Sequence, residues 1–149
     1  MTASDSVAYI IGIDLGTTNS AVSYVDLNAK DPREIQIFQV PQLTGPGEIG
    51  RENVLPSFLY IPGDYDIPAD AVVHPYKTTD RAFAGVYARD HGAKVPSRLV
   101  SSAKSWLCHH QADRKAKILP WGSSDEVAKI SPVAASAHYL AHIRKAWNA

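Results

Sequence analysis

The chain has 149 residues, and its 15 lysines and arginines are balanced by 15 aspartates and glutamates. A neutral chain of this length can bury a sizeable core, but it lacks the positive charge expected of a nucleic-acid-binding protein. One cysteine excludes an intrachain disulfide, no stretch is long and apolar enough to span a bilayer, and residues 1–6 lack the features of a secretory signal. The composition therefore predicts a cytoplasmic protein that binds neither nucleic acid nor a membrane.

Residues 7–40 predict three strands from their alternation and apolar content. These strands cover Val7 to Asp14, Ser20 to Val25 as its antiparallel neighbour, and Glu34 to Val40. Pro41 to Asn53 contains three glycines and two prolines, which predict a loop. Because the first strand is almost entirely apolar, we expect it to be a central strand that is buried on both faces.

A carboxylate and two threonines surround the turn after the first strand. Asp14 ends the apolar run, where an unpaired buried charge is costly, so we expect a cation partner, either a side chain or a metal ion. Gly16 permits a tight reversal and a close approach of backbone to ligand. Thr17 and Thr18 add hydroxyls beside exposed backbone N–H groups, a combination that binds phosphate oxygens. The pattern indicates nucleotide binding; the alternative is a hairpin in which these side chains only cap the turn.

The motif I-G-I-D-L-G-T-T-N-S at residues 11–20 is neither a Walker loop nor a Rossmann fingerprint, because the lysine is missing and the glycine spacing differs. It resembles the first phosphate-binding hairpin of the actin-like ATPases, and among them the heat-shock protein 70 (DnaK-type) chaperones. The resemblance implies an α/β fold with that superfamily's ribonuclease-H-like sheet, ATP or ADP as ligand, and Mg²⁺ held by Asp14 through water. The residues it places against the β- and γ-phosphates are Gly16, Thr17, Thr18 and Asn19.

The middle of the chain predicts a strand, an excursion and two helices. Phe58 to Ile61 is an apolar strand, and Pro62 to Asp80 is an exposed excursion with a short strand at 71–73. Ala82 to His91 predicts a short helix, and a longer one is predicted from about 97 to 110. The buried face of the longer helix would comprise Leu99, Ala103, Trp106 and Leu107.

Further motifs extend the resemblance as far as Lys104. Leu55-Pro56-Ser57 resembles the family's T-P-S strand, and Gly85-Val86-Tyr87-Ala88 resembles its G-x-x-A helix start. The resemblance makes Lys104 the lysine that reaches the terminal phosphate and the attacking water, where a compact positive charge stabilises the transferred group. Lys104-Ser105-Trp106-Leu107 departs from the usual K-R-L-I-G, which indicates a diverged bacterial member. From spacing alone, an ordinary surface lysine on an amphipathic helix is the simpler interpretation.

The last 32 residues, 118–149, predict two short strands and a helix. The strands would lie just before Pro120 and at Val127 to Ile130, and Ser131-Pro132 is a good N-cap and first turn for the helix. The helix would bury Val133, Ala137, Leu140 and Trp147, and Ser136 and Lys145 would lie on its other faces.

The family's next strand, which carries further active-site residues, does not follow this helix. The resemblance therefore implies the N-terminal half of a front lobe, with residues 1–42 and 132–149 in a core subdomain and residues 43–131 in a smaller outer subdomain. Such a fragment would bind ATP weakly or not at all and show no turnover. Its parent would be an ATP-driven, stress-response chaperone whose partners are client polypeptides and co-chaperones.

Two further enzyme classes and one non-enzyme class fit parts of the pattern. Ser101-Ser102-Ala103-Lys104 matches the Ser-x-x-Lys motif of penicillin-recognising hydrolases, in which one helical turn brings the lysine beside the serine, although the later motifs are missing. A sugar or acetate kinase of the same superfamily also opens with Asp-x-Gly-Thr. A non-catalytic interaction module would keep the fold and lose hydrolysis.

The histidines, the cysteine and the tryptophans predict no separate site. Cys108-His109-His110 has no set of metal-ligating partners, and His138 and His142 have no acidic ligand, so we expect solvated histidines on helix faces. Cys108 is expected to be a small buried residue. The three tryptophans, Trp106, Trp121 and Trp147, are expected to pack in the core rather than to stack on bases.

Overall fold

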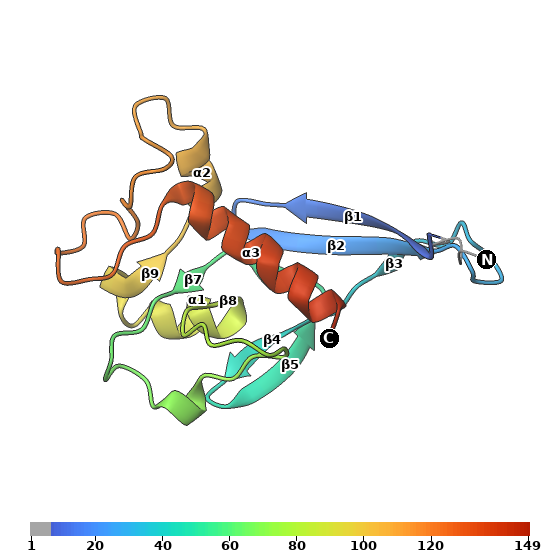
Figure 1. Cartoon of the computed structure of the whole chain (residues 1–149), viewed down its shortest axis with the longest axis horizontal. Helices are drawn as coiled ribbons and strands as arrows, with labels where there is room; N and C mark the ends of the chain where they lie inside the picture. The colour runs from blue at the N-terminus through green and yellow to red at the C-terminus, as the bar shows by residue number, and fades with distance from the viewer. Residues whose placement is uncertain (1–6) are drawn as a thin grey trace, which may run out of the picture.

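Three antiparallel sheets, two short α-helices and one long C-terminal helix make up the computed structural model, which describes residues 7–149 (Figure 1). The fold is a small mixed α/β domain, which agrees with the α/β class expected from the sequence. In the part of the chain that the structure describes, no helix is long and apolar enough to cross a membrane. The expected absence of a secretory signal concerns residues 1–6, which lie outside the described residues.

The first sheet is built on the hairpin of β1 (Tyr9–Leu15) and β2 (Asn19–Asp26), and their antiparallel pairing confirms the two predicted strands. On its other side β2 pairs with β3 (Gln36–Ile37), a shortened form of the predicted third strand, and with β6 (Leu55–Pro56). The central strand of this sheet is therefore β2.

The prediction that the first strand is central and buried on both faces is wrong. β1 lies at the edge of the sheet and pairs with β2 alone among the described strands. Ile10 and Ile13, whose side chains alternate between the two faces of β1, are 59% and 48% exposed. An apolar run identifies a strand, but it does not determine which neighbours cover that strand.

The segment 41–53, predicted as a loop, is mostly a second hairpin of β4 (Val40–Gly45) and β5 (Glu48–Glu52). Its turn contains Gly47 with φ of 70°, a conformation that glycine adopts without steric cost. β4 buries Leu43, which packs in a hydrophobic cluster with Tyr60 and Phe83. Gly45 and Gly47 lie at one tight turn, whereas Gly50 is part of β5, so the segment is not a long loop.

A third sheet is centred on β7 (Leu59–Tyr60), which lies within the strand predicted at 58–61. It pairs with β8 (Phe83–Ala84) and with β9 (Leu99–Val100). Because β8 occupies residues 83–84, the helix predicted from residue 82 begins later, as α1 (Val86–Gly92).

The buried side chain of Gln42 connects β4 to the start of α1. Its Oε1 accepts a hydrogen bond from the Val86 N–H at 2.9 Å, and its Nε2 donates to the Val54 carbonyl at 2.9 Å. Gly85 precedes the helix with φ of 106°, and a Cβ there would collide with the Gln42 amide. The glycine and the glutamine together fix where α1 begins.

The helix predicted over 97–110 is mostly wrong. Pro96–Arg98 forms a single 3₁₀ turn, β9 follows it, and α2 spans only Ala103–Leu107. Ser102, which lies between β9 and α2, adopts a left-handed conformation with φ of 54°. This conformation prevents one continuous helix from running through residues 97–110. Backbone pairing with β7 therefore outweighs the helical spacing of the apolar residues.

The C-terminal helix α3 (Pro132–Trp147) starts where the sequence predicts. The Ser131 hydroxyl accepts a hydrogen bond from the Ala134 N–H at 3.1 Å, which is the expected N-cap. The predicted buried face of α3 is wrong for three of its four residues, because Val133, Ala137 and Leu140 are exposed. The fourth, Trp147, packs against aromatic rings of β1 and β2. The residues that α3 does bury include Ala135, Ser136, Tyr139, His142, Ile143 and Ala146.

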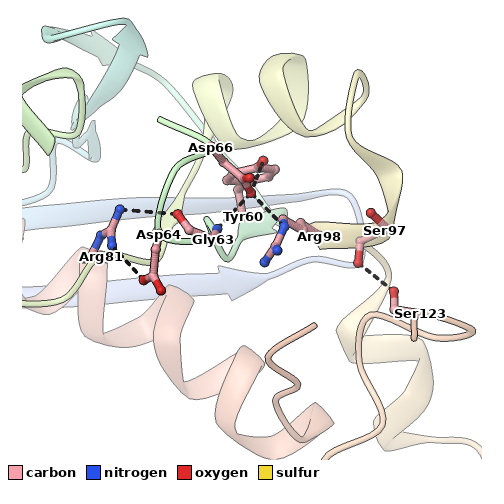
Figure 2. A network of polar contacts seen from close by, with 8 residues as sticks. All are labelled: Tyr60, Gly63, Asp64, Asp66, Arg81, Ser97, Arg98 and Ser123. Carbon is pink, nitrogen blue, oxygen red and sulfur yellow. Dashed lines mark hydrogen bonds and ion pairs between the residues drawn. The ribbon is translucent and has the colours of Figure 1, made fainter. Parts of the chain in front are cut away.

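Segment 62–80, predicted as an exposed excursion, is anchored to the domain. Ile67 is 3% exposed and packs in a hydrophobic cluster with Leu43, Tyr60, Phe83 and Ala88. Asp66 accepts from the Gly63 N–H at 2.8 Å and pairs with Arg98 at 2.7 Å (Figure 2). A 3₁₀ turn at Ala69–Ala71 takes the place of the predicted strand at 71–73.

The larger hydrophobic cluster lies between the sheets and α3. Its buried members include Val22, Leu55, Leu59, Val100, Tyr139 and Ile143. The two strands predicted around Pro120 are reduced to one bridge between Leu119 and Ile130, at the margin of this cluster.

Candidate functional site

The turn that connects β1 to β2 is held in place by Ser57, which follows β6. The Ser57 Oγ donates to the Gly16 carbonyl at 2.9 Å, and the Ser57 N–H donates to the Thr18 carbonyl at 2.8 Å. The Ser20 hydroxyl lies 3.0 Å from the Ser57 Oγ, and it is the donor because the single Ser57 proton is already used. Both serines are buried, so these bonds are shielded from water.

Gly16 is required at this turn because there is no room for a side chain. A Cβ at this position would collide with the Asn19 carbonyl. Its φ is not in the left-handed region, so the requirement is for space and not for an unusual backbone conformation. The close approach that the sequence suggested for a ligand is made by the backbone of Asn19.

The outer side of the turn presents polar groups to solvent. Thr17, Thr18 and Asn19 are all exposed. Within residues 7–149, no hydrogen bond uses the N–H groups or the hydroxyls of the two threonines. These donors are therefore free to bind oxygen atoms of a ligand, while the inner side of the turn is fixed.

Asp14 is exposed, which corrects the expectation of a buried carboxylate. It lies on the edge strand β1 opposite Ala21, two residues before Gly16. Among the described residues it forms no ion pair. Water solvates the carboxylate, so a cation partner is not needed for stability, and a hydrated cation can approach it from solvent.

Lys104 is the second residue of α2 and is half-buried. Its neighbour Ala103 is buried in the larger hydrophobic cluster, and Leu15, the last residue of β1, packs against the same cluster. The turn and the start of α2 are thus anchored on one core. No hydrogen bond or ion pair within the described range joins Lys104 to the turn.

The geometry does not support the Ser-x-x-Lys alternative. α2 begins at Ala103, after Ser102 in its left-handed conformation, so Ser101 and Lys104 do not share a helical turn. The hydrogen bond between nucleophile and lysine that this chemistry needs is also missing between these two residues.

The histidines of α3 are not solvated, which corrects the prediction for His138 and His142. His142 is 2% exposed; its Nδ1 lies 2.8 Å from the Tyr76 hydroxyl and its Nε2 lies 2.9 Å from the Pro41 carbonyl. Burial lowers the pKa of His142 to about 4. His138 lies 3.6 Å from Asp80, an acidic neighbour that sequence spacing did not identify. In residues 7–149, however, no group of three histidine, cysteine or acidic side chains could hold a metal ion.

Two other side-chain predictions need correction. Cys108 is exposed, because it follows the short helix α2 and lies outside the core. Trp106 and Trp121 contact each other with ring centroids 4.8 Å apart, but Trp121 is 68% exposed and belongs to the surface. Trp147 packs against Tyr9, Tyr24 and Phe38, as its predicted packing role requires.

Sequence reasoning found the residues of the turn but not the pair that supports it. Ser20 and Ser57 are 37 positions apart, and nothing local connects them. A signal was present in Leu55-Pro56-Ser57, where a serine adjoins an apolar run and would need a buried partner. No protein-family model and no curated protein matches the chain.

Proposed function

We propose that the chain is a nucleotide-binding part of a cytoplasmic ATPase of the heat-shock protein 70 type, with the actin-like fold that its first hairpin resembles. In this proposal the turn between β1 and β2 binds the β- and γ-phosphates of ATP or ADP. The parent protein uses hydrolysis of ATP to control the binding of client polypeptides, and co-chaperones are its further partners.

The observation that carries the proposal is the turn itself. Its inner side is fixed by two hydrogen bonds to Ser57, and its outer side presents free donors from Thr17 and Thr18. Because the donors are held before a ligand arrives, little conformational entropy is lost when phosphate oxygens bind. A turn that was only capped by its own side chains would leave fewer of these donors free.

The residues around the turn fit a magnesium-bound phosphate group. The carboxylate of Asp14 is exposed and free of ion pairs within the described residues, so it can hold Mg²⁺ through the water molecules that this ion retains. The metal would neutralise phosphate charge. The half-buried Lys104 would add a positive charge near the terminal phosphate in the complete ATPase domain.

A single phosphate-binding turn predicts weak binding. The chain offers one open turn, whereas a ligand of this size is normally enclosed on several sides. We therefore expect a Kd for magnesium-ATP of about 1–10 mM and no measurable turnover by the 149-residue chain alone.

The test is a titration of the ¹⁵N-labelled chain with magnesium-ATP, followed by amide chemical shifts. Shift changes should concentrate on residues 14–19, and they should be much smaller with AMP, which lacks the β- and γ-phosphates. Thr18→Ala should weaken binding about threefold or more, because one hydrogen bond to a charged group is lost. Thr79→Ala is the matched control, since Thr79 is an exposed threonine outside the turn.

Three results would contradict the proposal. The amide signals of residues 14–19 could fail to shift at about 10 mM magnesium-ATP. AMP could shift the same amides as strongly as ATP. A micromolar Kd at another place on the surface would also assign nucleotide binding to a different site.

A further inference from the structure

The segment that follows α2 forms an aromatic pocket at the surface. Residues 108–131 make the irregular loops that project beside α2 (Figure 1). Trp106, His109, Ile118 and Trp121 line a pocket of about 360 Å³ between α2 and these loops. This volume is at the small end for ligand sites, so it suits one bulky apolar group better than a large cofactor.

A second hollow of about 400 Å³ adjoins the pocket. The two share Ala112 and Asp113 as a common wall, and the second is also lined by Arg114, Lys115 and Val133. A linear ligand that enters the aromatic pocket can therefore continue directly into this basic hollow. Together the two make one groove with an apolar end and a basic end.

The charge at the basic end is not neutralised by the protein. Arg114, Lys115 and Lys117 are exposed, and none forms an ion pair within residues 7–149. Asp113, the carboxylate that lines both hollows, accepts a hydrogen bond from the Lys115 N–H at 2.9 Å and keeps its negative charge, but Arg114 and Lys115 outnumber it and leave the basic hollow with a net positive charge. The groove is thus complementary to a ligand that carries negative charge beside its apolar group.

Hydrogen bonds to the rest of the domain hold both ends of the groove. The Val133 N–H, at the start of α3, donates to the Arg114 carbonyl at 3.2 Å. Leu119 and Ile130 exchange two backbone hydrogen bonds of 3.0 and 2.7 Å, which fixes the chain on either side of Trp121. The groove is therefore formed before a ligand binds, which reduces the entropy lost on binding.

We propose that this groove binds a short acidic peptide segment that inserts one aromatic or large aliphatic side chain into the pocket, against the rings of Trp106 and Trp121, and lays its carboxylates against Arg114 and Lys115. The rings of Trp106, His109 and Trp121 pack on one another with centroids 4.8 and 5.3 Å apart. They form one pocket and not a row of separate stacking faces, so a peptide with a single anchor fits better than a nucleic acid strand. The site is independent of the turn proposed to bind nucleotide.

The probe is the peptide Asp-Glu-Asp-Leu-Phe-amide with fluorescein on its N-terminal amine, titrated with the full chain and followed by fluorescence anisotropy. We expect a Kd of about 10–200 µM that weakens as salt is raised, because charge attraction contributes. A peptide with lysine in place of each acid, or with serine in place of leucine and phenylalanine, should bind at least about tenfold more weakly.

Surface substitutions locate the site. Trp121→Ala and Lys115→Glu should each reduce affinity at least about tenfold, because one removes a wall of the pocket and the other reverses a charge. Tyr65→Ala and Lys94→Glu are the matched controls and should change affinity by less than about twofold, since Tyr65, which is 99% exposed, and the exposed Lys94 lie outside the groove.

The proposal is wrong if the acidic peptide shows no binding at about 1 mM chain, or if the lysine peptide binds equally well. Equal losses in the test and control variants would also overturn it. So would a thymidine oligonucleotide that binds the same residues more tightly than the peptide, because the groove would then belong to nucleic acid.

Discussion

Replacing Ser57 by alanine leaves two groups without their hydrogen-bond partner, the half-buried Gly16 carbonyl and the buried Ser20 hydroxyl. Because buried polar groups that lose a partner are costly, we expect Ser57→Ala to lower the free energy of unfolding by about 1–3 kcal/mol. The amide signals of Thr17 and Thr18 should broaden or shift as the turn loosens. Urea unfolding and amide spectra measure these two effects.

The matched control for this substitution is Ser124→Ala, which removes an exposed hydroxyl and should change stability by less than about 0.5 kcal/mol. If Ser57→Ala were as mild as the control and the signals of the turn were unchanged, the turn would not depend on Ser57. The free donors of Thr17 and Thr18 would then need another explanation.

His142 makes the stability of the domain depend on pH. Its Nε2 carries the proton, because it faces the Pro41 carbonyl, and its Nδ1 therefore accepts from the Tyr76 hydroxyl. A second proton on Nδ1 would force the Tyr76 hydroxyl to accept instead of donate, and it would place a charge near Lys145 and two further histidines. The additional histidines are His74 and His138, and both of these have Asp80 as an acidic neighbour.

The direction of this dependence follows from proton binding in the two states. Burial holds the pKa of His142 at about 4 in the folded chain, whereas the unfolded histidine titrates near 6.5. Between these pH values the unfolded chain binds more protons, so stability is fully present above pH 6.5 and falls by up to about 3 kcal/mol as the pH approaches 4. Burial lowers the pKa of His74 and His138 as well, which adds to the same trend.

Urea unfolding at several pH values between 4 and 7 tests this prediction. His142→Gln should flatten the pH dependence, and His110→Gln, at an exposed position, should leave it unchanged. A pH dependence that is equally steep in all three proteins would assign the effect to other groups.

At the scale of an element, Asp64 and Asp66, two of the four aspartates in segment 62–80, are two positions apart but lie in different environments (Figure 2). Asp66 pairs with Arg98 at 2.7 Å, with side chains 29% and 22% exposed, and also accepts from the Gly63 N–H. Asp64 is 88% exposed and pairs with Arg81 at 3.4 Å. Since water screens the exposed pair, Asp66→Ala should cost about 1–2 kcal/mol of unfolding free energy and Asp64→Ala less than about 0.5.

Each variant is measured by urea unfolding, and hydrogen exchange of Gly63 adds a local readout. The Gly63 amide should exchange faster in Asp66→Ala only. If the two variants lost the same free energy of unfolding, the burial of an ion pair would not determine its contribution to stability in this domain.

The helix α3 shows which features of an element can be predicted from neighbouring residues alone. Its start was predictable because Ser131 and Pro132 act within one turn. Its buried face was not, because the sequence places more hydrophobic side chains, Val133 and Leu140, on the exposed side. The helix buries His142 because Tyr76 and Pro41, distant in sequence, lie against that side. The turn at 16–18 was likewise predictable from contiguous residues, whereas its support by Ser57 was not.

At the scale of the whole molecule, the exposed apolar side chains gather in a few places. Five of them lie on or beside β1, namely Val7, Tyr9, Ile10, Ile11 and Ile13, and the outward side of α3 adds Val133 and Leu140. The chain has no net charge to keep copies apart. The other exposed hairpin edge differs, because β5 carries Glu48, Arg51 and Glu52. An apolar edge strand without charged residues in its middle favours pairing with a second copy.

We therefore predict that the chain self-associates through β1, and that Ile10→Lys weakens the association. Ile49→Lys is the matched control, because Ile49 is 41% exposed on β5 and the substitution adds the same charge. Because both variants raise the net charge equally, a difference in their self-association must come from the edge of β1 and not from the added charge. Sedimentation over a range of concentrations should show a lower average mass for Ile10→Lys alone, with both proteins within about 0.5 kcal/mol of the original stability. A chain that stays monomeric at high concentration, or equal masses for the two variants, would show that the backbone edge of β1 does not mediate pairing.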